Sequence, residues 1–218
     1  MTVYLSRLHF PVSTLGPGRR IGIWFQGCTI RCPGCISADT WAQGRHGARV
    51  EDVIDTISPW LREADGITIS GGEPFDQADG LYTLLSALRQ QSHGDILVYS
   101  GYPSERITDY LARMDGLIDA LISDPYYNNV PQTLALRGSD NQRLHLLTAL
   151  GAVRFASYER SLTDADRTLD VMFDDDGTVW MAGIPRQGDL HRLASLLHQD
   201  GHRVWTSQAL TPIKGHAL

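Results

Sequence analysis

Three cysteines are the residues of this chain whose type and spacing most clearly predict chemistry. Cys28, Cys32 and Cys35 are its only cysteines, and they form a C-x3-C-x2-C pattern. An odd number of thiols in one short segment is not a disulfide framework and favours a metal or catalytic role. Thiolates bind iron–sulfur clusters, and a cubane has four irons to satisfy. Three cysteines can therefore hold a [4Fe–4S] cluster whose fourth iron stays open for chemistry.

A structural zinc site completed by His46 is the main alternative for these thiols. Zinc sites usually pair two C-x2-C units, or one such unit with a distant pair of histidines. The single x3–x2 spacing fits neither pattern. Three unliganded thiols this close together are disfavoured as well, because exposed low-pKa thiols oxidise. We therefore favour the cluster over zinc.

A glycine-rich turn is the second candidate site, with the sequence Ser70-Gly71-Gly72-Glu73-Pro74. Glycines let the backbone approach a ligand closely, and the Glu73 carboxylate can accept hydrogen bonds from an ammonium group. Taken alone, the turn is an ordinary strand-to-helix connection. The upstream cysteines are what favours a ligand there.

Alternating strands and helices are predicted to position both sites. Apolar periodicity predicts the following elements: strands over 21–25, 66–70, 95–100 and 117–123, and helices over 49–63, 81–88 and 104–114, the last capped by Ser104. This alternation predicts an α/β fold with a mainly parallel sheet. Ligands of such sheets bind at the carboxyl ends of the strands, where the turn lies.

The pattern changes in the last third of the chain. Residues 125–145 look irregular, and the segments TLDVMF and TVWMAG flank a hairpin turn at 174–177. A helix capped by Asp189 then ends at Gly201. We therefore predict a core over residues 1–148 and a small α+β extension, a hairpin plus a helix, over 149–218. Trp180 and Trp205 are assigned to the core of the protein rather than to cofactor contacts.

The composition of the chain argues against nucleic acids and membranes as binding partners. The net charge of −6 and the scattered arginines argue against a nucleic-acid-binding surface. No stretch is long and apolar enough to span a bilayer, and the N-terminus lacks the apolar region of a signal peptide. We therefore expect a cytoplasmic protein that binds neither nucleic acid nor membrane.

The sequence resembles the radical S-adenosylmethionine (SAM) superfamily, whose signature is C-x3-C-x2-C. It is most similar to the small activases of glycyl radical enzymes, in particular those of the anaerobic ribonucleotide reductase type. Beyond the cysteines and the turn, six segments carry this resemblance: residues 16–20, 23–28, 40–41, 99–102, 124–126 and 136–143. One departure follows the third cysteine, where the family has an aromatic residue or His and then Asn but this chain has Ile36-Ser37.

The resemblance implies a partial (β/α) barrel that holds one [4Fe–4S] cluster and SAM. It implies that the turn at residues 70–74 holds the methionine amino group, with backbone contacts near Gly34 and Ile36. Ser100 ends the next strand and either hydrogen-bonds the ribose or carboxylate of SAM or caps a loop. Asp124 has the same two possible roles: a hydrogen bond to SAM or the capping of a loop. Arg137 and Asn141 either order the mouth of the site, contact the partner or lie in a solvated loop.

The resemblance also implies the reaction. One electron from the cluster cleaves SAM to methionine and a 5′-deoxyadenosyl radical, which abstracts a hydrogen from a glycine of a partner glycyl radical enzyme. No residue beyond the cluster and SAM is assigned a catalytic role. A flavodoxin or ferredoxin is implied as the electron donor, because the chain has no second cysteine cluster. Two alternatives stay open: a stand-alone radical SAM enzyme acting on a small molecule or peptide, and a non-enzymatic zinc or iron–sulfur module.

Overall fold

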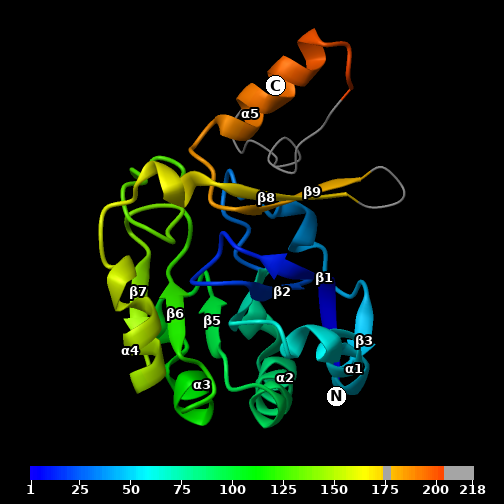
Figure 1. The fold of residues 1–218 in the computed structure, drawn as a ribbon, viewed down its shortest axis with the longest axis vertical. Helices are drawn as coiled ribbons and strands as arrows, with labels where there is room; N and C mark the ends of the chain where they lie inside the picture. The colour runs from blue at the N-terminus through cyan, green and yellow to red at the C-terminus, as the bar shows by residue number, and fades with distance from the viewer. Residues whose placement is uncertain (174–177, 204–218) are drawn as a thin grey trace.

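A seven-stranded sheet forms the centre of the molecule (Figure 1). The structure is a computed structural model, and it describes residues 1–173 and 178–203. In spatial order the strands are β3 (Gly47–Arg49), β1 (Thr2–Val12), β2 (Arg20–Phe25), β4 (Gly66–Gly71), β5 (Asp95–Tyr99), β6 (Ala120–Ser123) and β7 (Arg143–Leu146).

The middle of this sheet is parallel and its flanks are antiparallel. Strands β2, β4, β5 and β6 pair in parallel, whereas β1, β3 and β7 each pair antiparallel to a neighbour. Parallel strands buried on both faces consist of apolar runs rather than alternating ones, and every residue of β2 is buried. The large, mainly parallel sheet confirms the predicted α/β class. The partial barrel stays a prediction.

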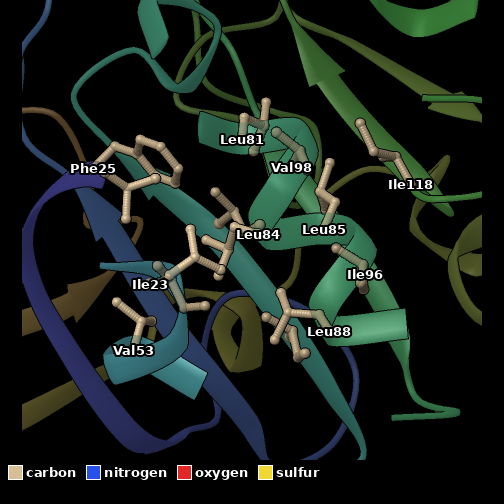
Figure 2. Close-up of a cluster of buried hydrophobic side chains, with 14 of the residues drawn as sticks. Ile23, Phe25, Val53, Leu81, Leu84, Leu85, Leu88, Ile96, Val98 and Ile118 are labelled. Atoms are coloured by element: carbon tan, nitrogen blue, oxygen red, sulfur yellow. The ribbon is translucent and has the colours of Figure 1, made fainter. Parts of the chain in front are cut away.

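Within residues 1–173 and 178–203, four helices pack on the sheet, three of them before or between its parallel strands and one after β7. They are α1 (Val50–Leu61), α2 (Ala78–Gln91), α3 (Thr108–Arg113) and α4 (Ala149–Phe155). The leucines of α2 recur at helical spacing and are fully buried against the sheet: Leu81, Leu84, Leu85 and Leu88 (Figure 2). Burial of each such side chain contributes about 1.5–3 kcal/mol, so this stripe fixes α2 between β4 and β5.

Several elements differ from the prediction. Ser104 does not cap a long helix: it begins the three-ten helix η3 (Ser104–Arg106), and Ile107 precedes the short helix α3. Strands β1, β3 and β7 and helix α4 were not predicted, and β7 lies partly in the segment expected to be irregular. Phe155 of α4 is fully buried with Leu97 and Ile122, so the first helix of the predicted extension packs on the sheet. The boundary at residue 148 therefore stays a prediction.

A two-stranded hairpin and a helix form the last part of the chain that the structure describes. Strands β8 (Leu169–Phe173) and β9 (Val179–Gly183) pair antiparallel, and α5 (Asp189–Gln199) follows them. Gly188 is the residue before α5, so Asp189 lies in the first turn rather than at the cap. Gly201 follows the helix with a φ of 87°, as expected of a C-terminal glycine. The predicted turn at 174–177 and Trp205 lie outside the described residues.

Among the described residues, none of the helices is both long and apolar enough to cross a membrane.

Candidate active site

The cysteines and the glycine-rich turn line the same cavity, which has a volume of about 470 Å³. It lies at the carboxyl ends of β2, β4 and β5, where α/β sheets bind their ligands. This volume is in the usual range for a small-molecule site. Within the cysteine loop, the turn and the end of β5, all but one of the predicted site residues line it: Cys28, Cys32, Gly34, Cys35, Ile36, Ser70, Gly71, Gly72, Glu73 and Ser100. The exception is Pro74, which is buried at the start of the three-ten helix η2 (Pro74–Gln77).

The cysteine loop begins directly after β2 and is fixed at its base by backbone hydrogen bonds. Gly27 has a φ of 104°, a conformation that favours glycine, and its N–H donates to the carbonyl of Thr40 at 2.7 Å. The N–H of Cys28 donates to the carbonyl of Trp41 at 3.3 Å. Both acceptors belong to the three-ten helix η1 (Ala38–Trp41), so the loop returns to its own starting point.

The thiols lie in a poorly solvated environment. Burial raises the pKa of Cys28 and Cys32 and raises the pKa of the Cys35 thiol to about 11. Deprotonated cysteine is the form that binds metal, and coordination to a cation deprotonates a thiol outright. All three thiols can therefore ionise together only when they bind metal cations.

The donor set fits an iron–sulfur cluster. Three thiols line one cavity, and thiolates are the ligands that such clusters use. Among the residues that the structure describes, no group of three or more His, Cys, Asp or Glu side chains is arranged to hold a metal ion. The three thiolates of such a cluster bind different irons, so they need not converge on a single ion. His46, the fourth ligand of the zinc alternative, lines a different pocket beside Leu5 and Leu8.

The two glycines of the turn allow β4 to pack against the end of β2. Gly71 has a φ of 100°, and a Cβ there would lie 2.5 Å from the backbone nitrogen of Phe25. A Cβ at Gly72 would lie 2.1 Å from the carbonyl oxygen of Gly27. The N–H of Glu73 donates to that same carbonyl at 2.8 Å. Any larger residue at either position would push the turn away from the cysteine loop.

Glu73 is buried inside the turn, with an exposure of 1%. Its Oε1 accepts hydrogen bonds from the N–H of Phe75 at 3.0 Å and the hydroxyl of Ser100 at 2.9 Å, and its Oε2 accepts one from the N–H of Gly101 at 2.8 Å. Burial raises the pKa of this carboxyl to about 7. The Ser100 hydroxyl also accepts from the N–H of Tyr102 at 3.1 Å. Within the protein, Glu73 and Ser100 therefore join the ends of β4 and β5, and their predicted contacts to SAM stay predictions.

Asp76 connects the cysteine loop to the turn, and this role was not predicted from the sequence. Its carboxylate accepts from the N–H of Thr29 at 2.8 Å, the hydroxyl of Thr29 at 3.0 Å and the hydroxyl of Tyr102 at 2.6 Å. Thr29 directly follows Cys28, and Tyr102 lies just beyond β5. No local motif marks such a contact between residues 47 positions apart.

The three loop candidates of the later segment do not line the cavity. Asp124 accepts from Arg143 at 2.7 Å, and Asn141 donates to the carbonyl of Pro125 at 2.8 Å. Arg137 is 2% exposed and pairs with Glu159, so it is a buried structural residue rather than part of a solvated loop. The cavity is instead lined from this side by four residues that were not predicted: Tyr126, Gln132, Gly138 and Gln142.

Comparison with known proteins identifies the family. The family of 4Fe-4S single cluster domains matches residues 14–145, which include the cysteine loop and the glycine-rich turn. This chain belongs to that family. The match confirms the iron–sulfur cluster predicted from the cysteine spacing.

Three relatives illustrate the similarity of this 4Fe-4S domain protein. The anaerobic ribonucleoside-triphosphate reductase-activating protein of Escherichia coli K12 is 28% identical over 148 residues, which cover 64% of this chain and 96% of the relative. The protein of that name in Enterobacteria phage T4 is 29% identical over 134 residues, or 59% of this chain and 85% of the relative. The pyruvate formate-lyase-activating enzyme of Listeria monocytogenes serovar 1/2a is 31% identical over 128 residues, which cover 55% of this chain and 51% of the relative. They confirm the resemblance to glycyl radical activases.

Proposed function

We propose that this chain is a radical SAM enzyme that activates a glycyl radical enzyme of the anaerobic ribonucleotide reductase type. The observation that carries the proposal is the shared cavity: the cysteine loop and the glycine-rich turn meet there, and both lie within the matched family region. The relatives from Escherichia coli and phage T4 carry the name of the reductase activator, which supports this partner over others.

In this proposal Cys28, Cys32 and Cys35 hold the cluster, and the turn at Ser70–Pro74 holds the methionine end of SAM. When bound, the cluster would supply the one electron needed to cleave SAM reductively, and the product radical would remove a hydrogen atom from the partner's glycine. The protein's own contribution is to bind the cluster and SAM in one cavity and to exclude water from it. Backbone groups near Gly34 and Ile36 and the hydroxyl of Ser100 complete the SAM site.

An external one-electron donor completes the reaction. The chain has three cysteines and hence no second cluster to relay electrons. A flavodoxin or ferredoxin in the cytoplasm fits this requirement. Neither nucleic acid nor a membrane takes part in the proposed reaction.

Electron paramagnetic resonance tests the proposal. The protein is purified anaerobically, and its iron, sulfide and zinc contents are measured. It is then incubated with SAM, a reductant and the anaerobic ribonucleotide reductase of the same organism. We expect iron and sulfide in the protein, 5′-deoxyadenosine among the products and a glycyl doublet on the reductase.

Two other outcomes would replace the proposal. Formation of 5′-deoxyadenosine without a glycyl doublet would reject the activase role and favour a stand-alone radical SAM enzyme. Zinc in place of iron, with no visible iron–sulfur absorbance, would favour the non-enzymatic module.

A further inference from the structure

The β8–β9 hairpin forms one wall of the catalytic cavity. In Figure 1 it lies above the sheet, in orange, and its buried residues pack with Val12 of β1 and Trp24 of β2. Residues 178–187, which contain β9 and the segment after it, line the same cavity as the cysteine loop and the glycine-rich turn. A molecule that reaches a ligand held by the loop and the turn therefore meets the hairpin.

The hairpin is anchored to the sheet and is not a loose flap. The carboxylate of Asp170 accepts from the N–H and hydroxyl of Ser13, both at 2.7 Å, and from the hydroxyl of Thr14 at 2.9 Å. Met172 and Ala182 are buried in one apolar cluster that also contains Trp24 of β2. The wall thus has a defined position before any substrate arrives, which lowers the cost of binding.

Trp180 connects this wall to the cysteine loop. The guanidinium of Arg7 lies 3.2 Å from the centre of the Trp180 ring, a cation–π contact. Arg7 also forms an ion pair with Asp39 of η1, the element that holds the base of the cysteine loop. All three side chains line the cavity. The tryptophan that the sequence reading assigned to the core therefore also presents part of its surface to the site.

The hairpin is an addition to the part of the chain that matches the family. The family match ends at residue 145, and the Escherichia coli relative is covered to 96% by 64% of this chain. The proposed cluster and SAM residues all lie inside the match. An added element that faces the same cavity without supplying cluster ligands is suited to select the second substrate rather than to perform the chemistry.

We propose that the β8–β9 hairpin is the substrate-selecting wall of this enzyme, with Trp180 as the residue that positions the segment around the reacting glycine. The wall is mainly apolar, with Trp180, Met181, Ala182, Ile184 and Pro185 on the cavity. It therefore fits a peptide segment with apolar side chains next to the glycine. This inference rests on the proposed function, because it takes the substrate to be a glycine of a partner protein.

Three variants test the wall. Trp180→Ala removes the ring, Trp180→Phe keeps an aromatic ring at the same place, and Phe173→Ala is the matched control. Phe173 is on the same hairpin, is 78% exposed and is not among the residues lining the cavity. For each protein we would measure cluster absorbance, SAM affinity by equilibrium dialysis, 5′-deoxyadenosine formation without partner, and kcat and KM for glycyl radical formation on the reductase.

We expect Trp180→Ala to raise KM for the reductase by about tenfold or more, as truncation of a central aromatic contact typically does. The rise in KM for the reductase should exceed any change in cluster absorbance, SAM affinity or partner-free 5′-deoxyadenosine formation, because the proposed cluster and SAM residues all lie outside the hairpin. Trp180→Phe should recover most of the loss, and Phe173→Ala should behave as wild type.

The failures of the two proposals are distinguishable. An unchanged KM in Trp180→Ala, or a loss of SAM affinity as large as the rise in KM, would overturn the wall and leave the activase role intact. A larger effect in Phe173→Ala than in Trp180→Ala would place the partner on the outer face of the hairpin and also overturn it. If the wild type cleaves SAM but forms no glycyl radical, the proposed function fails, and the peptide substrate named here fails with it.

Discussion

At the scale of single residues, Glu73 is a titratable carboxyl group that is almost completely buried. It is 1% exposed and accepts three hydrogen bonds, yet burial still raises its pKa to about 7. The ordinary glutamate pKa is about 4.3, so the folded protein holds a proton here that the unfolded chain releases. The stabilisation linked to this proton is complete below pH 4.3 and is lost as the pH rises through 7.

Glu73→Gln should therefore flatten the pH dependence of stability. Between pH 5 and 8, the wild type should lose about 2–3 kcal/mol of unfolding free energy relative to the variant, since a pKa shift of one unit corresponds to 1.36 kcal/mol. Urea unfolding of both proteins, prepared identically and followed by circular dichroism, measures this difference. Parallel pH curves would show that the Glu73 carboxyl is ionised throughout and that its burial is fully offset by its hydrogen bonds.

The cysteines provide a second test at this scale. A cubane held at three irons by three thiolates loses one third of its protein ligands when Cys32 is replaced by Ser. We expect the Cys32→Ser protein to contain as little iron and sulfide as a variant in which all three cysteines are replaced. His46→Ala is the control, because His46 lines a different pocket and should leave the iron content unchanged. Loss of metal from His46→Ala, with zinc bound in the wild type, would contradict the cluster.

At the scale of elements, Asp76 of η2 holds the cysteine loop to the turn. Its carboxylate accepts two hydrogen bonds from Thr29 and one from Tyr102. Residues that orient metal ligands typically change metal affinity or activity by about 10–100-fold when they are lost. Asp76→Ala should therefore shift the electron paramagnetic resonance spectrum of the reduced cluster and speed cluster loss to a chelator by about tenfold or more.

In the same experiment, Asp76→Asn distinguishes the hydrogen bonds of this side chain from its negative charge. The amide oxygen can accept from Thr29, so this variant should lie between wild type and Asp76→Ala in its rate of cluster loss. Asp79→Ala is the matched control: Asp79 lies in the first turn of α2 and pairs with Arg113 at the surface. A chelation rate in Asp76→Ala equal to that in Asp79→Ala would contradict the positioning role.

The elements also show what the sequence predicts and what it does not. Strands β2, β4 and β5 and helix α2 were predicted, because their apolar runs or stripes are complete and consist of residues that the fold buries. Strand β7 was not, because it is a half-exposed edge of four residues whose pairing with β6 is determined by tertiary contacts. Helix α4 is only seven residues long, too short for a periodic signal.

The residues of the candidate site also fall into those that the sequence predicts and those that it does not. The cysteines and the turn are contiguous motifs, so their spacing alone predicted two groups that do line one cavity. Tyr126, Gln142 and Trp180 reach that cavity from separate parts of the chain, and no local pattern encodes their approach. The hairpin itself was predicted from its sequence, but its place over the site follows from the contacts of Asp170 with Ser13, more than 150 positions away.

At the scale of the whole molecule, the end of the sheet opposite the cavity carries a buried charge network. Asp95 begins β5, and its fully buried carboxylate pairs with Arg20 of β2 at 2.6 Å and with Arg154 of α4 at 2.8 Å. Arg20 is also fully buried and donates to the hydroxyl of Thr68 at 2.6 Å. The network thus joins the first parallel strand, the third and the first helix after residue 148, while the reactive groups lie at the other end of the strands.

Asp95→Ala should therefore destabilise the molecule without changing the site. Removing the carboxylate leaves the Arg20 charge buried without its partner, which costs about 3–5 kcal/mol. Arg154→Ala is the matched control. Its side chain is 32% exposed and Asp95 keeps its pair with Arg20, so this variant should lose less than about 2 kcal/mol. Urea unfolding measures both losses, and SAM affinity of the folded proteins should match wild type. Equal losses in the two variants would show that solvent reaches Arg20 when Asp95 is absent, and a changed SAM affinity would show that the two ends of the sheet are coupled.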